Sequence, residues 1–394
     1  MSVQSSYDAI TVDELRSRGS RKWSEPGQDC LGAWVAEEDF GTAPAVHAAL
    51  EDVAARGLYG YLPDWLAADL RAAFTDFLHR RYAWDVPTER VAVAPDVLAG
   101  LEHLLRRIDP SAAVLVPTPA YMPFLDTPRR LGRRVIQVPH TRGADGRDEL
   151  DLEAMDAVMR TEHVGLVILC NPHNPTGRVL TREELQAFDR LMEAHPDVWV
   201  FSDEIHAPVV LAGASHLPYA SLSPAAAART LTATSTSKAF GLPGLKCAQL
   251  VLPAGHTEDP DELERLLRLA ATPGVAAAIA AYTDGDTWLQ DFLDYLACTS
   301  ELLVQLVAEH LPGAELRAPE GTYVAWLDCS GLDLPEDPAA FFLREAGVAL
   351  SAGGACGEGY EQHVRLVYAT PRPVLRSMIT AMGAAVRSVH APAH

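Results

Sequence analysis

Short apolar runs recur through the middle of the sequence, and longer amphipathic stretches flank them. The runs have the character of buried strands, and they cover residues 112–117, 133–139, 164–172, 198–204 and 230–238. The amphipathic stretches have helical spacing, and they cover residues 43–57, 66–82, 98–108 and 181–195. Buried strands that alternate with helices form a mostly parallel sheet with helices on both faces. The sequence therefore predicts an α/β fold whose ligands bind beyond the carboxyl ends of the strands.

The last hundred residues follow a different pattern. A long helical stretch precedes two predicted strands, at 321–330 and 363–370. This order predicts a smaller α+β domain, and we expect the N-terminal segment to pack with it. The chain has 394 residues, which is long for a single core. We expect a large domain over residues 45–285 and a small domain formed by residues 1–44 and 286–394.

The composition excludes several classes of partner. The formal net charge is −21, from 32 basic and 53 acidic residues. Nucleic acids and anionic membranes bind basic patches, so neither is an expected partner. The six cysteines are scattered without a CxxC pair, which favours a reduced cytoplasmic protein without a metal site. The polar N-terminal stretch lacks the apolar segment of a signal peptide, and no apolar run has membrane-spanning length.

Two polar motifs follow predicted strands. "NPHNPTGR" (171–178) combines prolines and a glycine into a loop that offers side-chain amides to a pocket. "FSDEIH" (201–206) places Asp203 at a strand end, where a carboxylate can pair with a buried cation. Taken alone, the first motif is also consistent with a tight strand-to-helix turn, and the second with an ordinary strand-end carboxylate.

The stretch "TSTSKAFGLPGLK" (234–246) is more specific. An amine such as that of Lys238, in an apolar pocket near a second cation, has a depressed pKa and is nucleophilic. The Ser235 hydroxyl before it and the Lys246 cation after it suit a phosphate anchor. An aldehyde cofactor that carries a phosphate uses all three groups. Pyridoxal 5′-phosphate (PLP) is such a cofactor, and its ring nitrogen needs an acidic partner, for which Asp203 is the candidate.

In this order, the motifs resemble those of fold-type I PLP enzymes of the aminotransferase superfamily. Among these, the chain is most similar to the MalY/PatB-type cystathionine β-lyases, which are carbon–sulfur lyases. "NPHNP" together with "SDEIH" is more typical of these lyases than of ordinary aminotransferases. The matching stretches span nearly the whole chain, at residues 22–40, 59–61, 119–124, 171–178, 202–206, 235–246, 280–289, 319–328 and 364–372.

The resemblance implies a role for individual residues. Lys238 would hold PLP and move protons, Tyr121 would stack on the ring, and Arg365 would bind the substrate α-carboxylate. Asn174 would donate to the phenolic oxygen of the ring and border the substrate. The family's sites lie at a dimer interface, so Tyr61 would contact the cofactor phosphate of the partner in a homodimer. The complete implied cofactor pocket consists of Lys238, Asp203, Asn174, Tyr121, His206, Ser235, Ser237, Lys246, Val97, Leu98 and Tyr61.

The chain departs from the family pattern at several positions. Glu37 and Glu38 stand where an Asp-Met pair is usual, so they either bind a cationic or polyhydroxyl substrate or face solvent. Asp96 stands where glycine is common, beside the expected phosphate site. Its carboxylate would repel the phosphate, so it must point away or pair with a cation. Lys246 replaces a frequent arginine, which exchanges a fork of donors for a point charge.

The resemblance implies β-elimination from an S-substituted cysteine, which yields a thiol, pyruvate and ammonia. A cysteine S-conjugate of secondary metabolism is one candidate substrate. Two alternatives stay open: another PLP reaction, either decarboxylating or oxidative deamination of an S-cysteinyl conjugate or aminotransfer, and a regulatory role through a transcription factor. The products distinguish the reactions, because decarboxylation releases an aldehyde and carbon dioxide.

Overall fold

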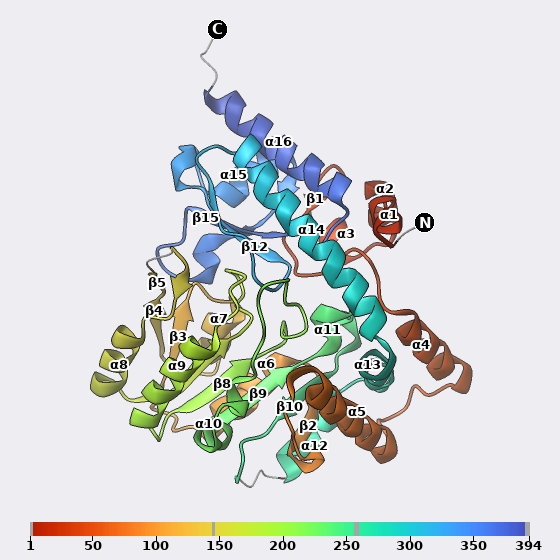
Figure 1. The fold of residues 1–394 in the computed structure, drawn as a ribbon, viewed down its shortest axis with the longest axis vertical. Coiled ribbons are helices and arrows are strands. Elements are labelled where there is room, and N and C mark those ends of the chain that lie inside the picture. The colour runs from red at the N-terminus through yellow and green to blue at the C-terminus, as the bar shows by residue number, and fades with distance from the viewer. Residues whose placement is uncertain (1–2, 144–145, 256–259, 391–394) are drawn as a thin grey trace.

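A seven-stranded sheet carries the predicted motifs (Figure 1). The structure is a computed structural model, and it describes residues 3–143, 146–255 and 260–390. The strand order is β2 (Val91–Ala94), β10 (Ala248–Val251), β9 (Thr230–Thr234), β8 (Trp199–Asp203), β7 (Val164–Cys170), β3 (Ala113–Thr118) and β4 (Val135–Pro139). Neighbouring strands from β9 to β4 are parallel, whereas β10 is antiparallel to both β9 and β2. The predicted mostly parallel sheet is confirmed, and the short strands β2 and β10 are additions to it.

Helices cover both faces of this sheet. Side chains along β3 alternate between two cores: Leu115 packs in a cluster with Phe188, and Val114 packs in another cluster with Leu104. Strand β3 is therefore apolar on both sides, as the sequence predicts for a strand inside the sheet. The helices of this region are α4 (Pro44–Arg56), α5 (Asp64–Tyr82), α6 (Val97–Arg107), α7 (Pro123–Arg130), α8 (Leu152–Thr161), α9 (Arg182–Ala194), α10 (Pro224–Arg229), α12 (Pro260–Leu269) and α13 (Thr272–Asp284).

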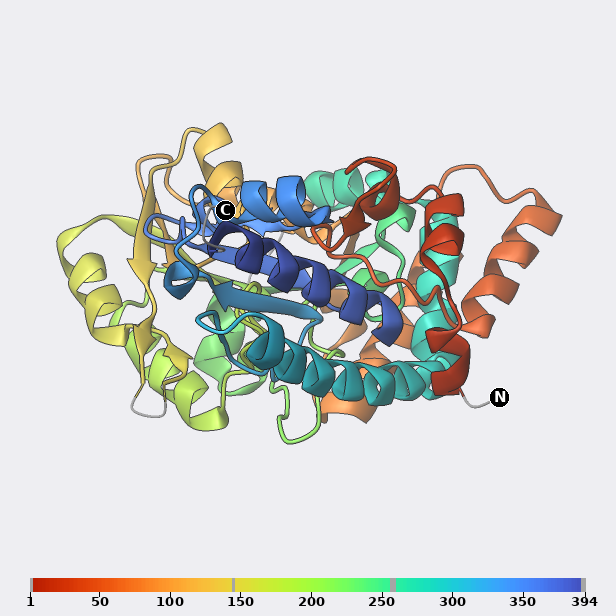
Figure 2. The same ribbon diagram turned by 90° about the horizontal axis from the view of Figure 1, so that it is seen from above.

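A second, antiparallel sheet lies above the first (Figures 1 and 2). Its strand order is β11 (Glu315–Leu316), β12 (Val324–Asp328), β15 (His363–Val367) and β14 (Ser351–Ala352). The helices around it are α14 (Asp286–His310), α15 (Pro338–Ala346) and α16 (Arg372–His390). The N-terminal helices α1 (Val3–Asp8), α2 (Val12–Ser17) and α3 (Arg21–Ser24) lie beside α14, and β1 (Leu31–Gly32) pairs with β13 (Val348–Ala349). One hydrophobic core joins Tyr7 and Trp23 to Tyr295 and Phe292 of α14. The domain boundaries at residues 44 and 286 stay predictions.

The segment that carries Lys238 differs from the prediction. The strand expected over residues 230–238 ends at Thr234, and the short helix α11 (Thr236–Ala239) begins directly after it. Ser235 is the N-cap of α11, and its hydroxyl accepts a hydrogen bond from the Ser237 N–H (3.1 Å). A serine in this position ends a strand because its side chain replaces the next strand partner of the backbone. Lys238 therefore projects from a helical turn at the end of the sheet.

Two further elements complete the description. A hairpin of β5 (Thr141–Arg142) and β6 (Asp148–Glu149) follows β4. Within the described ranges, no single helix is long and apolar enough to cross a membrane, and only the pair 261–269 and 272–284, bent by 87°, passes that test jointly.

Candidate active site

The predicted residues converge where the carboxyl ends of β7, β8 and β9 meet the second sheet. Asn174 follows β7, Asp203 is the last residue of β8, and Lys238 lies just after β9. Arg365 comes from β15 of the other sheet, and its Nη1 donates to Asn174 Oδ1 (3.1 Å). Residues that lie 191 positions apart in the sequence are therefore in direct contact.

The Lys238 amine lies in an environment that favours its neutral form. Its Nζ donates to the carbonyl oxygen of Ala36 (2.9 Å). Burial, and after it the Arg365 charge, lower the pKa of Lys238 to about 8, although the charges of Glu37 and Asp203 oppose the shift. The lowered pKa makes the neutral form of the amine accessible near pH 8, and that form is the nucleophile and the base that the sequence predicts here.

Asp203 is a buried carboxyl beside this amine. Burial raises the pKa of Asp203 to about 7, although its Oδ1 accepts a hydrogen bond from the Ile205 N–H (3.0 Å). His206 lies close by with its ring centroid 5.7 Å from that of Tyr323, and burial holds the His206 pKa well below its usual value. Among the described residues, His206 Nδ1 has no hydrogen-bond partner. The histidine is therefore neutral and has one nitrogen available.

Arg365 is held in one orientation. Its Nη2 donates to the carbonyl oxygen of Trp34 (2.9 Å) and to Ser351 Oγ (3.1 Å), in addition to the Nη1 contact with Asn174. Its Nε is buried and has no hydrogen-bond partner within the described ranges. Burial also lowers the pKa of Arg365. Because the guanidinium has no carboxylate partner in these hydrogen bonds, an incoming carboxylate would supply the missing charge.

The expected phosphate site combines hydroxyls with a helix N-terminus. The Oγ atoms of Ser235 and Ser237 are 2.6 Å apart. Asp96 is the N-cap of α6, so residues 97–98 form its first turn, and Asp96 Oδ1 accepts from the Ala99 N–H (2.9 Å). The other carboxylate oxygen of Asp96 lies 3.2 Å from Lys246 Nζ. Asp96 thus pairs with a cation, as its position requires.

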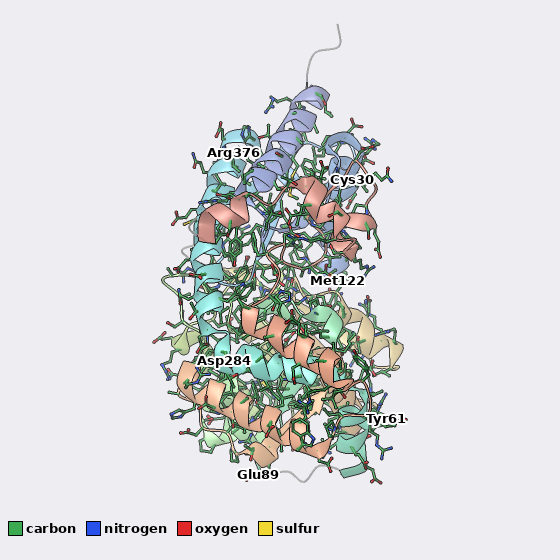
Figure 3. All side chains as sticks on the ribbon, turned by 90° about the vertical axis from the view of Figure 1, so that its right-hand side faces the viewer. Cys30, Tyr61, Glu89, Met122, Asp284 and Arg376 are labelled. Carbon is green, nitrogen blue, oxygen red and sulfur yellow. The ribbon has the colours of Figure 1, made fainter. Side chains whose placement is uncertain are left out.

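The two predicted tyrosines have different settings. The Tyr121 ring packs edge-to-face on Phe124 at 5.3 Å, and burial raises the pKa of its hydroxyl. Tyr61 is 96% exposed and projects from the molecular surface (Figure 3). The chain by itself therefore does not bring Tyr61 to the other site residues.

The two unusual glutamates separate in the structure. Glu38 turns away from solvent and accepts a hydrogen bond from the Phe40 N–H. It lies against Gly241, in the loop after Lys238, and burial raises the pKa of Glu38 to about 8. Glu38 is therefore half-buried, and its carboxylate is held by the backbone of its own segment. Glu37 acts on the Lys238 amine, since its charge raises the Lys238 pKa.

An ion pair that the sequence analysis missed holds this segment in place. Lys22 Nζ lies 2.8 Å from Asp39 Oδ2 and donates to the carbonyl oxygen of Glu37 (3.0 Å). Trp23 Nε1 donates to the other oxygen of Asp39 (2.8 Å). The available signal was a lysine beside a tryptophan in "KWSE", upstream of "EEDF".

The donor set fits PLP. Desolvation is the main perturbation of Asp203, so a cationic ring nitrogen would restore the charge of its carboxylate. The Lys238 amine is poised to attach an aldehyde, and the Ser237 hydroxyl can donate to the phosphate, whereas the Ser235 hydroxyl donates to the carbonyl oxygen of Cys247 (2.7 Å) in this structure. The unpartnered Nδ1 of His206 adds a polar contact in the same pocket.

Comparison with known proteins agrees with this geometry. The family model described as aminotransferase class I and II matches residues 35–381. The chain belongs to this family. Within the family it is similar to cystathionine β-lyase of Corynebacterium glutamicum (34% identity, covering 92% of this chain and 96% of the relative). It is also similar to cystathionine β-lyase PatB of Bacillus subtilis (31% identity, covering 90% and 93%).

The structural comparison gives the same result. The PLP-bound C–S lyase of Staphylococcus hominis superposes with a TM-score of 0.87 at 30% identity, covering 96% of this chain and 98% of that one. The fold-type I architecture, the family resemblance and the PLP cofactor are confirmed. The chain is thus a PLP-dependent enzyme of the C–S lyase group within the aminotransferase class I and II family.

Proposed function

We propose that this enzyme catalyses β-elimination from an S-substituted cysteine, releasing a thiol, pyruvate and ammonia. One observation carries the proposal: a buried amine of lowered pKa, that of Lys238, shares a pocket with the oriented guanidinium of Arg365. Such a pair can take a proton from Cα of an amino acid whose carboxylate is fixed. The similarity to enzymes named cystathionine β-lyase supports the choice of this reaction.

Each residue has a defined task in this proposal. When bound, PLP supplies an electron sink for the bonds at the substrate Cα. The neutral Nζ of Lys238 accepts the Cα proton, and Arg365 orients the α-carboxylate. With PLP bound, Asp203 would balance the charge of the ring nitrogen, the Asn174 amide would donate to the phenolic oxygen, and Tyr121 would cover the ring face.

The phosphate subsite works around the Lys246–Asp96 pair. Because these two side chains neutralise each other, a bound phosphate depends on the Ser235 and Ser237 hydroxyls and on the N–H groups of residues 97–98. In this proposal, directed hydrogen bonds to the phosphate take the place of an unpaired positive charge in the subsite.

We propose a homodimer in which Tyr61 completes the phosphate subsite of the partner subunit. Its 96% exposure leaves the hydroxyl available to a second copy. Tyr61→Phe should weaken PLP retention by roughly 1 kcal/mol, the contribution of one hydrogen bond. Full activity of a monomer, measured by light scattering and assay at the same low concentration, would contradict the dimer.

The substrate proposal rests on Glu37. With Glu38 turned into the protein, Glu37 is the acidic side chain that borders the amine, so it favours a polar or cationic group on the substrate sulfur. An S-conjugate of cysteine with such a group should be preferred over cystathionine, whose far end carries a carboxylate.

A product analysis tests the function. The holoenzyme is incubated with cystathionine and with an S-(2-aminoethyl) conjugate of cysteine, and the products are identified by mass. Pyruvate with a thiol supports β-elimination, whereas an aldehyde with carbon dioxide, or an amino group passed to a keto acid, refutes it. Glu37→Gln should reduce the preference for the cationic conjugate, and Glu25→Gln, in an exposed pair with Arg21, serves as the control.

The predicted cytoplasmic location belongs to the same proposal. All six cysteines are free thiols in the structure, which suits a reducing compartment.

A further inference from the structure

A groove with a volume of about 920 Å³ lies apart from the residues of the PLP site. Its walls come from the end of α5, from the loops that follow β7 and β8, and from the segment before β12. Six arginines line it, namely Arg80, Arg81, Arg147, Arg178, Arg182 and Arg317. Two carboxylates, Asp148 and Glu320, lie among them. A protein with a net charge of −21 therefore concentrates cations on one groove.

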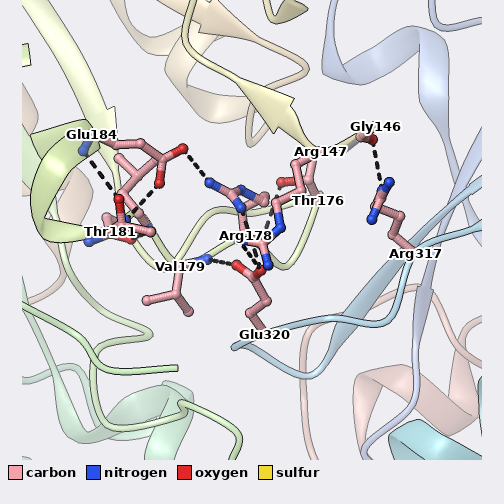
Figure 4. Close-up of polar contacts among 11 residues, drawn as sticks. Gly146, Arg147, Thr176, Arg178, Val179, Thr181, Glu184, Arg317 and Glu320 are labelled. Atoms are coloured by element: carbon pink, nitrogen blue, oxygen red, sulfur yellow. Dashed lines mark hydrogen bonds and ion pairs between the residues drawn. The ribbon is translucent and has the colours of Figure 1, made fainter. Parts of the chain in front are cut away.

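Both carboxylates already have arginine partners, and Asp148 Oδ1 lies 4.0 Å from Arg142 Nε. Glu320 Oε1 lies 3.4 Å from both Arg147 Nη1 and Arg178 Nη1, and Glu320 Oε2 accepts from the Val179 N–H at 3.0 Å (Figure 4). Burial raises the pKa of Asp148. The lining therefore keeps an excess of positive charge after these pairs are formed.

Two of the arginines, Arg81 and Arg182, have guanidinium groups without a carboxylate partner among the described residues. Arg182 is exposed and forms no hydrogen bond or ion pair with the described residues. Arg81 is also exposed, and its Nη2 donates only to the carbonyl oxygen of Pro208 (3.1 Å), which leaves its charge without a carboxylate partner within the described ranges. Arg80, by contrast, is held by Asp76 and Asp286.

We propose that this groove binds a small polyanion, a molecule with at least two phosphate or carboxylate groups. Guanidinium groups bind such groups with paired hydrogen bonds, and all the lining cations except histidine are arginines. The volume lies within the range of small-molecule pockets. Arg178 and Asn174 belong to the same loop, and Arg178 lines the groove whereas Asn174 contacts Arg365.

Calorimetric titration of the holoenzyme with pyrophosphate and with citrate tests this site. PLP occupies its own phosphate subsite in the holoenzyme, and its absorbance reports that it stays bound. We expect saturable binding of at least one probe at physiological salt, weakened tenfold or more in Arg81→Gln/Arg182→Gln. Preference between the probes distinguishes a phosphate ligand from a carboxylate ligand. Arg376→Gln is the matched control, because Arg376 (labelled in Figure 3) is an exposed arginine of α16 that does not line the groove.

Four results would overturn the proposal. They are the absence of binding, an equal loss in the control variant, binding to the apoenzyme alone, and binding of poly-glutamate without either small probe. The third would assign the anion to the PLP site, and the fourth would assign the groove to an acidic protein segment. A thermal unfolding curve of each variant verifies that it is folded.

Discussion

Replacing Lys22 should test how the active-site segment is held. The exposed fractions of the Lys22 and Asp39 side chains are 0% and 4%, so water does not screen this ion pair. Lys22→Met leaves the Asp39 carboxylate buried without its cation, with only the Trp23 indole still donating to it. Removal of one partner of a buried pair costs about 3–5 kcal/mol. We expect a loss of that size in the free energy of unfolding of the holoenzyme.

The neighbouring residue provides the control. Arg21 forms an exposed pair with Glu25 on the same short helix, with exposed fractions of 62% and 51%, and such pairs contribute about 0–1 kcal/mol. Urea unfolding is followed by tryptophan fluorescence and by PLP absorbance for both variants.

A second variant identifies the cause. Adding Asp39→Asn to Lys22→Met removes the unpaired charge while an amide oxygen can still accept from Trp23, so the double variant should be more stable than Lys22→Met alone. If Lys22→Met is no more destabilised than Arg21→Met, the pair does not hold the segment and the reasoning fails.

Three more predictions concern the cofactor and the substrate. Because burial lowers the Lys238 pKa from 10.5 to about 8, the neutral amine predominates above pH 8. The rate of PLP uptake by the apoenzyme should therefore rise with pH up to about 8 and then level off, and a rise that continues to pH 10 would refute this. Arg365→Lys should raise KM at least tenfold, since a point charge replaces a fork, while PLP stays bound; an unchanged KM means that another cation binds the carboxylate. Gly241→Ala should reduce PLP loading, because φ is +67° and the added methyl group would collide with the carbonyl oxygen of Gly41 as well as with Glu38, whereas Gly244→Ala has open space and should load normally. Equal loading of both variants, measured by absorbance, would show that the contact with Glu38 is unimportant.

The order of elements and the cofactor could be predicted from the sequence. Both depend on local information: apolar runs of strand length alternate with helical stretches, and each motif directly follows its strand. Asn174, Asp203 and Lys238 meet because the carboxyl ends of parallel strands lie at one edge of the sheet. The boundary after Thr234 was missed, since the capping hydroxyl of Ser235 ends a stretch whose composition continues to favour a strand.

Only the tertiary structure decided which charged side chains are buried and with whom they pair. Lys246 meets Asp96 across 150 positions, and Lys22 meets Asp39 across 17 positions. Glu37 and Glu38 are identical in type, adjacent in sequence and both half-buried, yet the charge of Glu37 acts on the Lys238 amine and Glu38 lies against Gly241. The reason is physical: the free energy of a charge depends on its desolvation and its nearest partner, and distant segments of the chain supply both.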